Sequence, residues 1–162
     1  MKTGIVFVLI MIAGCAGPLQ QEGVDRKGKD QPLVIQLAAN GCVEEVLPPT
    51  DDNCRDPDAT IRAGCSDLKD CACGARGKFV SWRVRSPSEM KPAGGVAPQL
   101  PDFSIRFKGK TNPFRQPCRL EANAGGTIRC IIGRDASGDY DYGVKVSSCT
   151  EEYDPRIVIR NF

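Results

Sequence analysis

Residues 78–85, KFVSWRVR, carry the clearest structural signal in the chain. Their side chains alternate, with Phe79, Ser81, Arg83 and Arg85 on one face and Val80, Trp82 and Val84 on the other. Because successive side chains of a β-strand point to opposite faces, this pattern predicts a strand with one face buried. We interpret Trp82 as a core residue and not as a platform for a ligand, since a valine lies two positions away on each side.

Further strand-like runs follow along the chain, with turn residues between them. Residues 33–37 are a compact β-prone run and residues 42–47 can form its returning strand, while the alternating pattern recurs at residues 102–108, 127–132, 140–146 and 156–159. Asn40-Gly41 is a turn dipeptide between the first two, while residues 86–101 form a long, proline-rich loop. No long run has helical spacing. About seven alternating strands predict an all-β fold, an antiparallel β-sandwich.

Residues 136–144, ASGDYDYGV, resemble the tyrosine corner of immunoglobulin-like and cupredoxin-like sandwiches. In such corners a strand's tyrosine hydrogen-bonds back to the main chain, a role that the resemblance implies for Tyr140. Residues 112–114 and 154–159 are also similar to segments of small bacterial cupredoxin-like modules. The resemblance spans residues 33–160 and implies the architecture alone. A blue-copper site needs histidine ligands, and the chain has no histidine.

The N-terminal residues 1–15, MKTGIVFVLIMIAGC, have the organisation of an export signal. Lys2 provides a positive head, and the apolar run at 4–11 is shorter than the about 20 residues that a permanent membrane helix needs. The ending IAGC resembles the lipobox of bacterial lipoproteins. There the cysteine receives a diacylglycerol, the chain is cut before it, and the new amino group is acylated, for example with palmitate. An ordinary secretory signal with a chance cysteine is the alternative.

The lipobox resemblance implies a domain organisation and a location. Residues 1–14 would be the signal peptide, and lipidated Cys15 would hold the protein in a membrane of the bacterial cell envelope. An aspartate after that cysteine favours the inner membrane in such lipoproteins, so Ala16 implies the outer membrane and a periplasmic setting. Residues 15–31 then form the lipidated N-terminus and a flexible polar tether, and residues 32–162 the β-sandwich domain.

The cysteine content of the body predicts a disulfide framework. Besides Cys15, the chain contains Cys42, Cys54, Cys65, Cys71, Cys73, Cys118, Cys130 and Cys149. An even number in an exported chain indicates disulfides, although the sequence does not choose among the pairings. Five of these cysteines precede the loop at 86–101 and three follow it. If all of them pair, at least one bridge must therefore join the two sides.

Residues 50–77 are rich in cysteine, aspartate and glycine and poor in apolar residues, so we predict a cysteine-rich loop insertion that is ordered by cross-links. Within it, thiolates at Cys71 and Cys73 could hold a soft ion such as Cu(I), with Cys65 or Cys54 completing the shell. We favour the alternative that each joins a different disulfide partner, because cysteines at this spacing pair with each other only under strain. The C-x-x-C spacing of a redox-active dithiol is absent.

The lack of histidine also limits the chemistry, because histidine is the usual general base and the commonest metal ligand. Ser-His-Asp, Cys-His and zinc-hydrolase mechanisms are excluded, and no nucleotide fingerprint is present. Two carboxylates suffice for glycoside cleavage. Nothing in the spacing of the candidates favours such a pair: Glu44, Glu45, Glu89 and Glu121. We expect a protein that is not an enzyme and has no cofactor.

Two further patterns have plain interpretations. Residues 51–58, DDNCRDPD, offer oxygen ligands for Ca²⁺ but lack the glycine and terminal glutamate of an EF-hand, so we interpret them as a solvated acidic loop. Basic residues at Arg83, Arg85, Arg106 and Lys108 either meet an anionic partner or form a solvated face.

The chain has a formal charge of only +2, and its basic residues are dispersed along the sequence, so nucleic acid is not an expected partner. We expect a non-catalytic structural or binding module whose partner is an envelope protein or polysaccharide. The alternative is a soft-metal or thiol-handling protein that uses Cys71 and Cys73.

Overall fold

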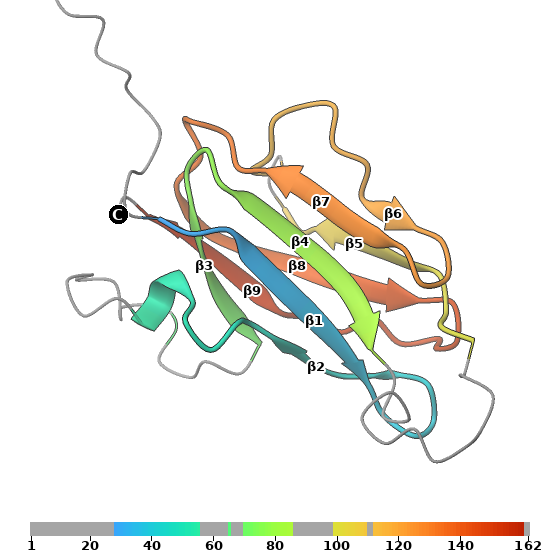
Figure 1. Cartoon of the computed structure of the whole chain (residues 1–162). Coiled ribbons are helices and arrows are strands. Elements are labelled where there is room, and N and C mark those ends of the chain that lie inside the picture. The colour runs from blue at the N-terminus through green and yellow to red at the C-terminus, as the bar shows by residue number, and fades with distance from the viewer. Residues whose placement is uncertain (1–27, 56–64, 66–69, 86–98, 110–111, 161–162) are drawn as a thin grey trace, which may run out of the picture.

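The computed structural model describes residues 28–55, 65, 70–85, 99–109 and 112–160. These residues form an all-β sandwich of two facing sheets, held by disulfides (Figure 1), which confirms the predicted fold class. The strands are β1 (Gln31–Leu37), β2 (Val43–Leu47), β3 (Cys71–Ala75), β4 (Phe79–Arg85), β5 (Phe103–Phe107), β6 (Glu121–Ala122), β7 (Thr127–Ile131), β8 (Gly138–Val146) and β9 (Arg156–Arg160). A single 3₁₀ turn, η1 (Asn53–Arg55), is the one helical element among them.

Both sheets are mixed, and in this respect the prediction of a purely antiparallel sandwich is wrong. The first sheet has the order β2-β1-β4-β7, and the second the order β3-β9-β8-β5-β6. β1 pairs with β4 in parallel, with Leu33 opposite Trp82, and β3 pairs with β9 in parallel, with Cys73 opposite Val158. After the β1–β2 hairpin the chain crosses to the second sheet for β3 before it returns as β4. Alternation predicts which residues face the core, but it does not encode this strand order.

The core lies between the sheets and is centred on aromatic side chains. Trp82 and Tyr142 are completely buried, and the Trp82 Nε1–H donates a hydrogen bond to the Tyr142 hydroxyl at 3.2 Å. The Trp82 ring meets Tyr142 and Phe114 edge-on, with centroids 5.8 and 5.7 Å apart. Such pairs combine a large buried apolar area with a fixed geometry, and the one buried indole N–H has a partner. The prediction that Trp82 faces the core is confirmed.

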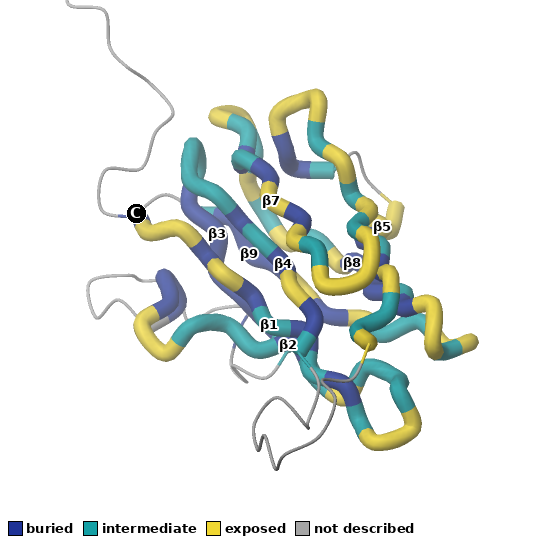
Figure 2. Tube along the Cα trace, turned by 45° about the vertical axis from the view of Figure 1, so that its right-hand side comes forward, coloured by how far each residue is buried: buried dark blue, intermediate teal, exposed yellow. Residues whose placement is uncertain are grey.

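Strand β3 lies within residues 50–77, the range that we predicted to be a loop insertion. All five of its residues are buried, so its sequence CACGA has no alternation to detect (Figure 2). A Cβ atom added at Gly74 would lie 2.5 Å from Cδ1 of Ile132, which explains why the strand carries glycine there. The end of this range is therefore a core strand of the second sheet.

Several predictions fall on residues that the structure does not describe. These include the signal segment, Cys15, most of the tether and the loop at 86–98. Among the described residues, none belongs to a helix with the length and apolar character that a membrane crossing requires.

Candidate functional site

The sandwich has two lateral edges that differ in how they are covered. We call the edge formed by β2 and β3, with η1 beside it, the closed edge. The edge formed by β6 and β7, together with residues 117–123, is the open edge. Each edge brings together the outermost strand of the first sheet and the outermost strand of the second.

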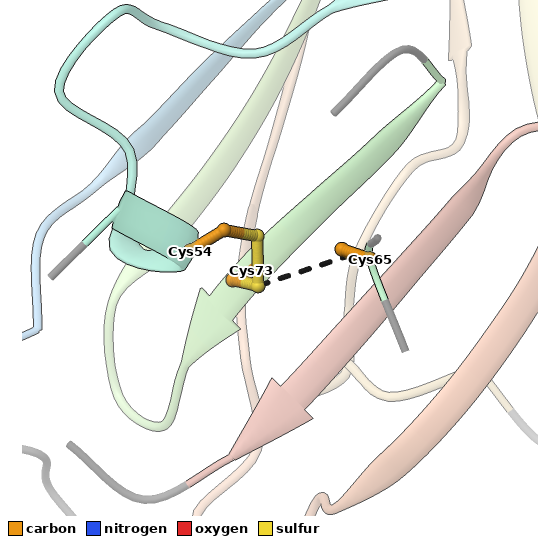
Figure 3. Close-up of side chains that lie close together, drawn as sticks. All are labelled: Cys54, Cys65 and Cys73. Carbon is orange, nitrogen blue, oxygen red and sulfur yellow. Dashed lines mark hydrogen bonds between the residues drawn. A yellow bond between two sulfur atoms is a disulfide. The ribbon is translucent and has the colours of Figure 1, made fainter. Parts of the chain in front are cut away.

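The closed edge contains two disulfides packed against each other. Cys54 of η1 is bonded to Cys73, and Cys65 is bonded to Cys71. The Sγ atoms of Cys54, Cys65 and Cys73 all lie within 4.8 Å of one another, and the Sγ atoms of Cys65 and Cys73 are 3.9 Å apart (Figure 3). All four cysteines are at most 8% exposed, and Val158 of β9 packs against them. We call these four residues the sulfur cluster.

The remaining body cysteines also form disulfides. Cys42 is bonded to Cys149 across 107 residues, and Cys118 is bonded to Cys130 across 12. The expected long-range bridge is therefore Cys42–Cys149. As predicted, Cys71 and Cys73 take different partners. In this disulfide form neither of them offers a thiolate ligand.

Asp70 organises the closed edge, although no pattern in the sequence indicated such a role. Its backbone has a φ of 62°, which is rare for a residue other than glycine. Its carboxylate accepts hydrogen bonds from the Val46 N–H at 2.8 Å and from the Tyr153 hydroxyl, while its carbonyl accepts one from the Arg156 N–H at 2.8 Å. Burial and the Asp70 carboxylate raise the pKa of Tyr153, so the phenol remains a donor. One aspartate thus ties β2 and β9 to the start of β3.

Where the structure describes the predicted oxygen-rich loop at 51–58, its polar side chains bond to other parts of the protein. The Asn53 side chain accepts a hydrogen bond from the Lys29 N–H at 2.8 Å and donates to the Cys73 carbonyl at 3.0 Å. Asp51 forms an ion pair with Lys29, and the hydrogen bond and charge of this lysine lower the pKa of the Asp51 carboxyl. Asp56 and Asp58 lie outside the described residues. In this part of the loop, Asn53 fastens η1 to Lys29, two residues before β1, and to β3.

The open edge is hollowed by two adjacent cavities, of about 290 and 410 Å³. They share a wall formed by Arg119, Glu121, Ala122 and Asn123. The first cavity extends to the start of β5 and the end of β8, and the second extends along Thr127, Ile128 and Arg129 of β7. We call the two cavities together the edge groove. Neither the alternation pattern nor any motif indicated it, because its walls come from segments that are separate in the sequence.

Strand β7 presents free main-chain groups to the edge groove. The N–H and C=O of Ile132 bond to Lys78 and Gly77 on the β4 side, whereas the C=O of Ile131 accepts a bond from Arg115 on the other side. Main-chain direction alternates along a strand, so the groups of Thr127 and Arg129 also point away from β4. Within the described residues, β7 pairs with β4 alone, and no backbone hydrogen bond reaches these outward groups.

Three of the charged side chains around the edge groove, those of Asp102, Arg129 and Lys145, are engaged elsewhere. The Arg129 guanidinium lies 3.6 Å from the centroid of the Phe79 ring and 3.7 Å from the Asp30 carboxylate, on the outer face of the first sheet. Lys145 donates to the Thr150 carbonyl, and the Asp102 carboxylate accepts from the Ala124 N–H at 2.7 Å. Arg119 and Glu121, which line both cavities, are exposed, so the edge groove offers these two side chains together with the main chain of β7.

The four basic residues singled out in the sequence lie on two different sheets. Arg83 and Arg85 belong to β4 of the first sheet. On the second sheet Arg106 contacts both carboxylate oxygens of Glu152 at 3.0 Å, and Lys108 pairs with Glu152 and Asp154. The hydrogen bond from Arg106 lowers the pKa of Glu152. These four residues do not form one basic surface.

The structure also shows where Tyr140 and the candidate glutamates lie. The Tyr140 hydroxyl donates to the Ser137 carbonyl, three residues upstream, at 3.2 Å, as the resemblance to a tyrosine corner implies. Glu44 and Glu45 lie on β2 at the closed edge, whereas Glu121 lies on β6 at the open edge. Glu89 is outside the described residues. The three described glutamates therefore do not share one site.

Comparisons with known proteins yield no relationship on which to base a function. No protein-family model matches the chain, and no curated protein sequence matches it either.

Proposed function

We propose that the protein is a lipid-anchored bacterial envelope protein with a non-catalytic binding module, and that its edge groove takes an extended segment of a partner protein. The free edge of β7 carries this proposal. An incoming strand would pair with the outward main-chain groups of Thr127 and Arg129 and extend the first sheet. The adjacent cavities would accommodate its alternate side chains.

The contrast with the closed edge supports this choice. Proteins protect the outermost strands of their sheets because free N–H and C=O groups invite pairing with another chain. At the closed edge, the side chains of Asn53 and Asp70 bond to main-chain groups of β3 and β2, and η1 lies alongside. No comparable cover lies over Thr127 and Arg129 within the described residues. An edge left unpaired beside a groove is suited to a partner strand.

Attachment through Cys15 would hold this module at a membrane surface. The support is the signal-like segment at 1–15, since a hydrophobic run, small residues and a cysteine coincide there. Several acyl chains anchor far more firmly than one, because each buried methylene contributes about 0.8 kcal/mol. Of the predicted tether, Gln31 is buried in β1 and Lys29 is bonded to Asn53, so these residues belong to the domain. The polar residues that precede them, from residue 16 on, would let the domain reach partners near the membrane.

Binding is tested with a random-peptide phage library panned on the mature domain, produced with Cys15→Ser. We expect enriched peptides whose binding protects the Thr127 and Arg129 amides from hydrogen exchange. Thr127→Pro should weaken binding roughly tenfold, because proline removes an outward N–H at the first position of the strand, where it is tolerated.

The matched control is Arg134→Pro, which places proline at the second position of the turn from Gly133 to Ala136 and should leave binding unchanged. Failure to enrich any peptide, or equal binding by the two proline variants, would contradict the groove proposal. Binding of envelope polysaccharide by the same groove would contradict the choice of a protein partner.

The anchor is tested separately with the full chain. Cys15→Ser should move the protein from the membrane fraction to the soluble periplasmic fraction and abolish incorporation of labelled palmitate. A variant that is still cut and remains in the membrane fraction would show that the lipobox interpretation is wrong.

A further inference from the structure

We propose that the sulfur cluster is a thiol–disulfide exchange site, in which a Cys65 thiolate attacks Sγ of Cys73. This inference does not depend on the edge groove or on the lipid anchor. It arises from the two neighbouring disulfides of the closed edge, in which Sγ of Cys65 lies 3.9 Å from Sγ of Cys73.

The two disulfides of the cluster are neighbours. Exchange proceeds by attack of a thiolate on a disulfide sulfur, in line with the S–S bond. The Sγ atoms of Cys65 and Cys73 are 3.9 Å apart (Figure 3), and Sγ of Cys65 also lies within 4.8 Å of Sγ of Cys54, so it lies beside the Cys54–Cys73 bond. The Cys65 side chain, once freed from Cys71, therefore has to rotate to come in line for attack on Cys73. Cys73 is completely buried, so an external thiol does not reach its sulfur, whereas Cys71, the sulfur that the external thiol attacks, is 6% exposed. Among the described residues, the Cys42–Cys149 and Cys118–Cys130 bridges belong to no such group of sulfurs.

The reaction requires an external dithiol as reductant. One of its thiolates attacks Sγ of Cys71, forming a mixed disulfide and releasing the Cys65 thiolate. That thiolate attacks Sγ of Cys73: the Cys65–Cys73 bond forms, the Cys54–Cys73 bond breaks, and Cys54 leaves as a thiolate that takes a proton from water. The second thiol of the reductant then resolves the mixed disulfide and frees Cys71. In total one dithiol is oxidised to a disulfide, and the protein gains two electrons and two protons.

The exchange would change what holds η1 in place. In the oxidised form the Cys54–Cys73 bond fastens η1 to β3. After exchange, Cys65 takes over the bond to Cys73, and η1 is held by the hydrogen bonds of Asn53 without a covalent link. The site therefore couples the oxidation state of an external dithiol to the cover of the closed edge.

The direct test is Cys71→Ser in the otherwise intact chain, which leaves Cys65 without its partner. We expect a thiol-alkylating reagent, followed by peptide mapping without reduction, to label both Cys65 and Cys54, because the remaining bond moves between Cys54–Cys73 and Cys65–Cys73. Label on Cys65 alone would overturn the proposal. Label on Cys73 would show attack at Cys54 and would equally overturn it.

The matched control is Cys130→Ser, which frees Cys118 at the open edge, where we expect label on Cys118 alone. A second measurement uses the unchanged protein treated with one molar equivalent of dithiothreitol, so it does not depend on the folding of a variant. We expect the main two-electron product to have free thiols at Cys54 and Cys71 and a bond between Cys65 and Cys73. Free thiols at Cys65 and Cys71, with Cys54–Cys73 intact, would overturn the proposal.

Discussion

The closed and open edges of this sandwich carry cross-links of similar span but in different surroundings. Cys54–Cys73 closes a loop with a sequence separation of 19, and Cys118–Cys130 one with a separation of 12. By loop-closure entropy alone, each bridge contributes roughly 3 kcal/mol. At the closed edge both cysteines of the bridge lie in a buried sulfur cluster, whereas at the open edge Cys130 is buried and Cys118 is half-buried beside the edge groove.

This difference separates two uses of a disulfide. The closed-edge bridges take the place of a conventional apolar core, because β3 consists of small residues and cysteines. The open-edge bridge fastens residues 117–123, one wall of the edge groove, to β7. We therefore expect changes at the closed edge to affect stability most and changes at the open edge to affect binding most.

Removing the closed-edge bridge should have the largest effect. We expect Cys54→Ala with Cys73→Ala to lower the free energy of unfolding by roughly 4–5 kcal/mol, because a cavity in the buried cluster adds to the lost loop constraint. Urea unfolding followed by the fluorescence of Trp82, the one tryptophan, measures this loss.

The matched control for the comparison is Cys118→Ala with Cys130→Ala, which should lose roughly 2–3 kcal/mol. Equal losses for the two double variants would show that the buried surroundings add nothing to the closed-edge bridge. A larger loss at the open edge would reverse the comparison.

Asp70 allows the closed edge to be weakened without changing a cysteine. We expect Asp70→Ala to lower the free energy of unfolding by roughly 2–4 kcal/mol, because the Val46 N–H loses its acceptor and alanine is strained at a positive φ. Asp70→Asn should lose roughly 1 kcal/mol or less, since asparagine tolerates that conformation and keeps an acceptor oxygen. Similar losses for both variants in urea unfolding would contradict this role.

A change on the second sheet, away from both edges, should have the smallest effect. Glu152 is paired with Arg106 at the surface, so Glu152→Gln should lower the free energy of unfolding at pH 7 by about 1 kcal/mol or less. The pKa of Glu152 is lowered in the folded protein, so its contribution is present above its ordinary pKa of 4.5 and is lost as the pH falls through the folded value. Unfolding curves of both proteins should therefore converge in acid; a constant difference would contradict the ion pair as its cause.

The sequence predicted those parts of the fold where one face of a strand is buried. Alternation located β4, β5, β7, β8 and β9, and it placed Trp82 correctly in the core. A β-prone run and the Asn40-Gly41 turn located β1 and β2. It did not locate β3, because a strand buried on both faces shows no alternation, or β6, which has two residues. The parallel pairs also went undetected, since pairing depends on the path of the chain between the sheets.

The candidate sites were predictable to a smaller extent. Cysteine spacing alone indicated that Cys71 and Cys73 would take different partners. The contact between Cys65 and Cys73 depends on how two disulfides pack, which no local pattern records. In the same way, the role of Asp70 follows from a positive φ and from partners on β2 and β9 that are distant in the sequence.

Residue-resolved amide hydrogen exchange of the free protein tests the difference between the edges most directly. Within β7 the amides of Ile128 and Cys130 face β4, whereas those of Thr127 and Arg129 face the open edge. We predict slow exchange for Ile128 and Cys130, and exchange faster by orders of magnitude for Thr127 and Arg129. Equal protection of all four amides would contradict the account, because it would mean that the edge of β7 is already covered.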